Sequence, residues 1–209
     1  VPLVVFRGGL LAGGAREAIR GGMSVRTMMS EPGMLRMLGT SSMHITGNFL
    51  YQFYMPVYTH AIGLSASAIG IVLAVNAAAE IAVRLILPRL IARYREANVL
   101  ACTLYTGAVS LTLIPFFENA AILALISFVF GFAMGGAGPI ITLLMFANAP
   151  KGRSGEALGF RMTVNFSTKL ISPVIFGAIA SGVGLFHIFW INALMLGAGG
   201  KLSQGTKHR

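Results

Sequence analysis

The stretch "AVNAAAEIAVRLILPR", residues 74–89, is almost entirely apolar, yet it carries Glu80 and Arg84 near its middle. With its apolar flanks it approaches the length of about 20 mainly apolar residues that a membrane-spanning helix requires. A charge at the centre of such a helix costs about 2.5–3.5 kcal/mol on insertion scales. The stretch therefore predicts a transmembrane helix, and its two charges need surroundings other than lipid.

The composition of the whole chain supports a membrane location. Of the 209 residues, 56% are hydrophobic and 11% are charged, and the mean hydropathy is +0.78. Soluble domains carry about 25% charged residues, so this chain has too few polar side chains to cover a soluble fold. The apolar runs are continuous rather than alternating, which excludes a transmembrane β-barrel. The predicted fold class is an all-α integral membrane protein.

Six apolar runs are long enough to be predicted as membrane-spanning helices. They cover residues 38–60, 67–88, 98–117, 120–145, 158–180 and 183–200. We expect residues 37–200 to form one six-helix transmembrane bundle. We expect residues 1–36 to form a cytoplasmic segment that contains the end of a preceding helix, and residues 201–209 to form a cytoplasmic tail.

Most of the lysines and arginines that give the net charge of +10 lie on one side of the predicted bundle. Lysines and arginines precede the first run, follow the second and fourth runs, and occupy the tail, whereas the loops at 61–66, 118–119 and about 180–184 contain none. This distribution is the positive-inside pattern and predicts that both termini are cytoplasmic. We therefore interpret the basicity as a determinant of topology, with membrane lipids rather than nucleic acid as the partner.

A short repeat accompanies the second and fifth runs. "SASAIG" at 65–70 and "SGEALG" at 154–159 share the pattern S-x-x-A-[I/L]-G, 89 residues apart and three helices further on. The two copies would have opposite orientations, and inverted three-helix repeats are typical of transporters. Six common residue types can also match by chance, so the repeat leaves both interpretations open.

Polar residues recur at helical spacing on three of the six runs, which predicts that one face of each run avoids lipid. The residues expected to line a substrate pathway are His44, Asn48, Tyr51, Gln52, Asn76, Glu80, Arg84, Arg161, Asn165 and Lys169. Each also has a structural interpretation: Glu80 and Arg84 can neutralise each other at i and i+4, and Asn76 and Tyr51 can simply pack between helices. Glu80 and Lys169 are near the midpoints of their runs, where ionisable groups usually have a function.

The fourth run, "FGFAMGGAGPIITLL", has a different pattern. Its glycines would allow close approach of another helix, and its proline would bend it. The residues expected to act in helix packing or as a hinge are Gly131, Gly135, Gly138 and Pro139.

Three stretches resemble the C-terminal six-helix half of a major facilitator superfamily transporter. They are "APKGRSGEALGFRMTVN" at 149–165, "SPVIFGAIAS" at 172–181 and "FYMPVYTHAIGLSASAIG" at 53–70. The resemblance covers residues 36–200, whereas "PRLIARYRE" at 88–96 departs from the Asp-Arg-x-Gly-Arg motif that the family often has there. It implies a 3+3 inverted repeat that forms half of a twelve-helix fold, with residues 1–36 joining the two halves.

The resemblance also implies a function and partners. We expect a secondary active transporter of a bacterial cytoplasmic (inner) membrane, moving a small organic solute by alternating access with a missing N-terminal half or a second copy. The hypothesis assigns proton coupling to Glu80. Arg84, Arg161 and Lys169 would tune Glu80 or contact an anionic substrate, and the remaining polar residues would line the path.

Two other functions are compatible with parts of the sequence. A non-transporting membrane scaffold would bury Glu80 and Lys169 without access to water. An intramembrane serine protease is suggested by the G-x-S-G match at 152–155, with His187 as the base. These residues fall at opposite membrane faces, about 30 Å apart, whereas a nucleophile and its base lie within about 3 Å. We therefore expect no enzyme, no cofactor and no metal, because the four histidines are scattered.

Overall fold

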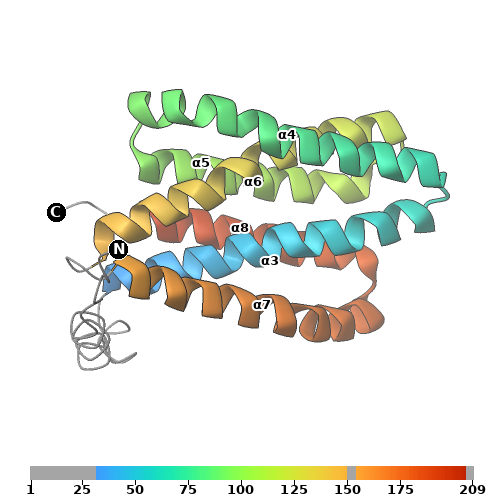
Figure 1. Cartoon of the computed structure of the whole chain (residues 1–209). Coiled ribbons are helices and arrows are strands. Elements are labelled where there is room, and N and C mark those ends of the chain that lie inside the picture. The colour runs from blue at the N-terminus through green and yellow to red at the C-terminus, as the bar shows by residue number, and fades with distance from the viewer. Residues whose placement is uncertain (1–31, 150–153, 206–209) are drawn as a thin grey trace, which may run out of the picture.

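The computed structural model describes residues 32–149 and 154–205, which form a bundle of six long α-helices (Figure 1). In chain order the elements are α3 (Pro32–Ala61), α4 (Ala66–Arg93), α5 (Glu96–Leu113), the 3₁₀ turn η1 (Ile114–Phe116), α6 (Ala120–Asn148), α7 (Ser154–Val183) and α8 (Leu185–Gln204). Successive helices run in opposite directions, so α3 begins and α8 ends at the same end of the bundle (Figure 1). Within these two ranges there is no strand, and the predicted all-α fold class is confirmed.

Local sequence explains where the helices begin and end. The side chain of Ser65 caps α4 by accepting a hydrogen bond from the Ala68 amide, and Asn119 caps α6 by accepting one from Ala121. Such caps satisfy backbone donors that a helix leaves free in its first turn. Gly63 and Gly184 have φ values of +84° and +92° in the α3–α4 and α7–α8 turns, a conformation that other residues rarely adopt.

Five of the six helices, α4 to α8, are long and apolar enough to cross a membrane. Helix α3 is not among them although it has 30 residues, and polar side chains such as His44, Asn48 and Gln52 interrupt its apolar surface. Helix α3 instead packs against α6, α7 and α8, so neighbouring helices cover much of it. Part of the polar surface of α3 therefore faces other helices, as the helical spacing of its polar residues predicted.

The repeat at 65–70 and 154–159 falls at equivalent places in the two halves of the bundle. Ser65 is the N-cap of α4, and Ser154 is the first residue of α7. The two helices begin at opposite ends of the bundle (Figure 1). This placement agrees with the fold class of a six-helix half built from two inverted three-helix units.

Helices α4 and α6 form a close contact at glycines of α6. A Cβ atom added to Gly135 would lie 2.6 Å from both the Cα atom and the carbonyl oxygen of Glu80. A Cβ atom on Gly131 would meet the backbone oxygen of Asn76. Gly138 faces α3 instead, where a Cβ atom would be in ordinary contact with His44, and Pro139 lies inside α6. The α4 backbone at Glu80 is therefore positioned by the absence of a side chain at Gly135.

Candidate functional site

Glu80 is held by an amide from the neighbouring helix α3. The Nδ2 atom of Asn48 donates a hydrogen bond to Oε1 of Glu80 at 2.9 Å, and Nε2 of Gln52 donates to Oδ1 of Asn48 at 2.7 Å. Gln52 is exposed, whereas Asn48 and Glu80 are half-buried. The three side chains form a line from the surface of the bundle to a carboxylate halfway along α4. We call them the Glu80 chain.

The pairing of Glu80 with Arg84, which the i and i+4 spacing allowed, does not form. Both residues belong to the described part of the chain, and the Glu80 side chain accepts its hydrogen bond from Asn48 instead. Arg84 is exposed on α4, and Lys169 is exposed on α7. Neither cation therefore compensates the charge of Glu80 within this bundle.

A second polar group joins α3, α6 and α7 around Arg161. Its Nε atom donates to Oγ of Ser41 at 3.0 Å, one terminal nitrogen donates to Oγ1 of Thr142, and the other donates to the carbonyl oxygen of Gly138 at 3.4 Å. Ser41 in turn donates to Oδ1 of Asn165 at 3.0 Å. The side chain of Arg161 is 8% exposed, and all three of these acceptors are neutral. A guanidinium charge is thus buried among neutral partners, which is costly in a membrane.

His44 is buried beside this group. Its Nε2 atom lies 3.1 Å from the carbonyl oxygen of Met134 on α6, so the neutral ring carries its proton on Nε2. The other ring nitrogen, Nδ1, is buried and has no hydrogen-bond partner among the described residues. His44 therefore links α3 to α6 and retains one acceptor.

Two of the predicted pathway residues lie in contacts between helices. Asn76 is 4% exposed and donates from Nδ2 to the carbonyl oxygen of Ser127 on α6 at 3.1 Å. Tyr51 is fully buried and stacks on Phe130 with ring centroids 4.4 Å apart. These positions match the packing interpretation that the sequence also allowed for both residues.

The sequence reasoning missed Ser41 and Thr142, which contact Arg161. Ser41 is three residues before His44, so its position on the predicted polar face of α3 was readable from spacing. Thr142 follows Gly138 by four residues and also donates to the Gly138 carbonyl oxygen at 3.0 Å. Serine and threonine commonly form such bonds inside helices, so Thr142 carried no signal of its own.

Replacing Arg161 by methionine is expected to change the free energy of unfolding by less than about 1 kcal/mol, or to stabilise the bundle. Methionine removes the buried charge, and both hydroxyl partners keep a bond, Ser41 to Asn165 and Thr142 to Gly138. Arg161→Lys is the matched control: it keeps the charge but loses the planar fork, so it should lower the unfolding temperature. Thermal unfolding in detergent measures both variants. A decrease of several kcal/mol in the free energy of unfolding of Arg161→Met would instead indicate that Arg161 has a structural role.

Comparison with known proteins identifies the family. The family model described as Major Facilitator Superfamily matches residues 37–202. A relative from Bacillus subtilis (strain 168), described as the uncharacterized MFS-type transporter YuxJ, is 32% identical over 82 residues. That match spans 39% of this chain and 21% of the relative, so the aligned part is about a fifth of the relative's length. The family match covers all six helices nearly completely, and this chain belongs to the major facilitator superfamily.

Proposed function

We propose that this chain forms one half of a secondary active transporter, which moves a small organic solute by alternating access coupled to protons. The family and the transporter description of the relative support transport rather than catalysis. The observation that carries the proposal is Glu80, a half-buried carboxylate in the middle of α4 whose recorded side-chain hydrogen bond comes from a neutral amide. A carboxylate without a fixed cation can take up and release a proton as its access to water changes.

The partly uncovered helices support a second half. Helices α7 and α4 are the two candidate spans least covered by the rest of the bundle. Leu170 and Val174 of α7 are 78% and 73% exposed, and Leu85 of α4 is 75% exposed. The same two helices carry Glu80, Arg84 and Lys169. We infer that another six-helix half, or a second copy of this chain, covers these helices and encloses the solute between the two units.

The remaining roles follow from position. Asn48 and Gln52 lead from the surface to Glu80 and would line the solute path, while Asn165 and His44 lie beside Arg161. Arg84, Arg161 and Lys169 would contact an anionic solute or adjust the proton affinity of Glu80. Gly138 and Pro139 would act as the hinge in α6.

The orientation is proposed from the charge distribution. The C-terminal ends of α4 and α6 are followed in the sequence by Arg95 and by Lys151 and Arg153, respectively. These two ends would lie in the cytoplasm, with both termini on that side. A bacterial cytoplasmic membrane is the proposed location, and the relative is a bacterial protein.

The protease alternative is disfavoured by the positions of its two residues. Ser154 is the first residue of α7, and His187 lies in α8 just beyond the other end of α7. A helix of 30 residues is about 45 Å long, so α7 separates the two side chains by far more than a hydrogen bond. The first part of the G-x-S-G match lies outside the described residues.

Access of water to Glu80 tests the transporter against the scaffold. A Glu80→Cys substitution in a Cys102→Ala background is expected to react with a membrane-impermeant maleimide in sided vesicles. The matched control is Ala79→Cys, because Ala79 neighbours Glu80 on the same helix but is fully buried, and it should stay unlabelled. Failure of Glu80→Cys to react from either side, in a folded protein, would favour the scaffold.

A further inference from the structure

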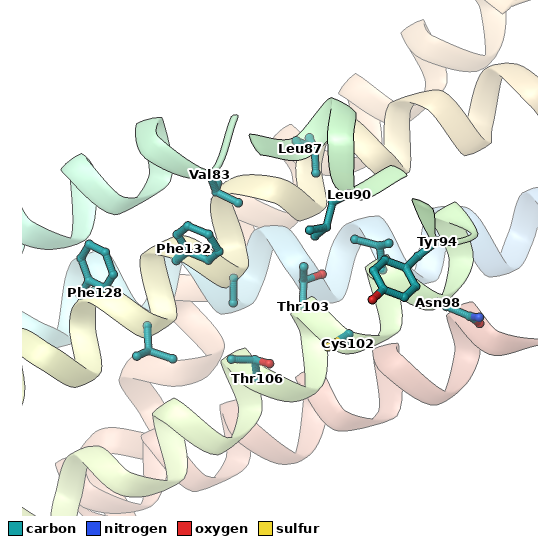
Figure 2. Close-up of a pocket in the computed structure, with 13 residues that line it drawn as sticks. Val83, Leu87, Leu90, Tyr94, Asn98, Cys102, Thr103, Thr106, Phe128 and Phe132 are labelled. Carbon is teal, nitrogen blue, oxygen red and sulfur yellow. The ribbon is translucent and has the colours of Figure 1, made fainter. Parts of the chain in front are cut away.

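An apolar groove lies between α4, α5 and α6, and none of its lining residues belongs to the Glu80 chain. Its volume is about 540 Å³. Figure 2 shows Val83, Leu87 and Leu90 of α4 along one wall, with Cys102 and Thr106 of α5 along the other. Helix α4 packs mainly on α6, and helix α5 packs on α8 and α6, whereas α4 and α5 make few contacts with each other, so the space between them stays open. In a bilayer this groove would face lipid.

A second hollow adjoins the first along the same helix. It has a volume of about 710 Å³ and is lined by residues of α5, α6 and the end of α8. The two hollows share Asn98, Cys102 and Thr106 of α5 and Val129 of α6. They therefore meet along one stripe of α5 and begin together at Asn98.

The length of the groove matches one leaflet of a membrane. It extends from Val83 of α4 to Tyr94, the residue that directly follows this helix. At 1.5 Å per residue this is about 16 Å. The hydrocarbon core of a bilayer is about 30 Å thick, so the groove reaches from the membrane surface to the midplane. An acyl chain of one leaflet has this reach.

The mouth of the groove is polar and positively charged. Tyr94 and Asn98 lie at one end of the groove, and Phe128 lies at the other (Figure 2). The guanidinium carbon of Arg93 lies 5.8 Å from the ring centroid of Tyr94. Residues 89–98 contain three arginines and one carboxylate, Glu96, and all three arginines are exposed. This end therefore offers cationic donors at the depth of lipid phosphates.

We propose that this region binds one anionic diacyl phospholipid. Its phosphate lies at Arg93 and Arg95, and its glycerol lies near Asn98. One acyl chain occupies each of the two hollows, on either side of the α5 stripe. The charge at the mouth selects an anionic headgroup, whereas the apolar walls accept any acyl chain of sufficient length. This site is separate from the proposed solute path and does not depend on the transport activity.

Fluorescence quenching by brominated lipids tests the site, because the chain has a single tryptophan. Trp190 lies on α8 outside both hollows, so the unmodified chain reports the surrounding lipid. The variant Trp190→Phe with Phe132→Trp moves the reporter into the groove wall. The proteins are placed in phosphatidylcholine bilayers that contain either dibrominated phosphatidylglycerol or dibrominated phosphatidylcholine. We expect phosphatidylglycerol to quench the groove tryptophan at least threefold more effectively, and both lipids to quench Trp190 equally.

Substitution of the arginines assigns the preference to the mouth. Arg93→Gln with Arg95→Gln is expected to remove the preference at the groove tryptophan, and Arg93→Lys with Arg95→Lys is expected to keep it. If Phe132→Trp does not fold, Phe128→Trp at the deep end of the groove serves as the reporter. Equal quenching by the two lipids, or a preference that survives both glutamines, would overturn the proposal. Absence of quenching by either lipid would also overturn it, because protein would then cover the groove.

Discussion

Replacing Glu80 by glutamine is expected to abolish proton-coupled transport by the complete transporter while leaving the bundle folded. Glutamine retains an Oε1 atom that can accept the hydrogen bond from Asn48, so the contact between α3 and α4 survives. The substitution removes only the titratable charge. Coupled accumulation of solute in proteoliposomes with an imposed pH gradient should fall to the background of empty vesicles.

Two comparisons separate coupling from a general loss of function. Exchange of labelled for unlabelled solute without a gradient should persist in Glu80→Gln, because binding and alternating access do not require net proton movement. Glu80→Asp keeps a carboxylate that is one methylene shorter, so it should retain part of the coupled accumulation. Coupled accumulation at the normal level in Glu80→Gln would exclude Glu80 as the coupling group.

The sequence was sufficient for the fold class and for the six helices within residues 32–149 and 154–205. Long apolar runs have few structural alternatives in lipid, because every backbone polar group must bond internally. The ends of the helices were less predictable. Helix α3 begins at Pro32 rather than near residue 38, and α4 continues past Pro88 to Arg93. Hydropathy marks the part of a helix that meets lipid, whereas backbone hydrogen bonds continue into polar sequence at the membrane surface.

The candidate site was predictable one helix at a time. Spacing placed Asn48 with His44 on one face of α3, and Arg161 with Asn165 on one face of α7. It could not say which faces meet, so the bond from Asn48 to Glu80 was not predicted. Spacing of i and i+4 permits a Glu–Arg pair but does not select the rotamers, and in the structure Glu80 turns to α3 instead.

The contacts between helices determine which polar residues lie buried between two helices. Asn76 shares the polar face with Glu80 in sequence, yet its amide reaches the backbone of α6. This outcome depends on how closely α4 approaches α6, which the glycines of α6 determine. Sequence spacing within α4 contains no information on that distance. The residues 150–153 of the family-like loop and the terminal segments 1–31 and 206–209 lie outside the described residues.

Gly135→Ala is expected to destabilise the bundle by about 1–3 kcal/mol, and Gly135→Leu is expected to prevent folding. The added Cβ atom would lie 2.6 Å from the Cα atom and carbonyl oxygen of Glu80, and backbone atoms cannot turn away as a flexible side chain can. Helices α4 and α6 must therefore separate. Thermal unfolding of the purified protein in detergent measures the loss.

The adjacent glycine provides the control for this prediction. A Cβ atom on Gly136 would meet Leu87 and Val83 at 3.4 and 3.6 Å, which is ordinary contact, although Gly136 is buried in the same helix. Gly136→Ala should therefore be neutral, or more stable by up to about 1 kcal/mol, because alanine favours helix more than glycine does. Equal unfolding temperatures for the two alanine variants would contradict the close contact at Glu80. A selective loss in Gly135→Ala would show that this glycine positions the backbone of the proposed coupling residue against α6.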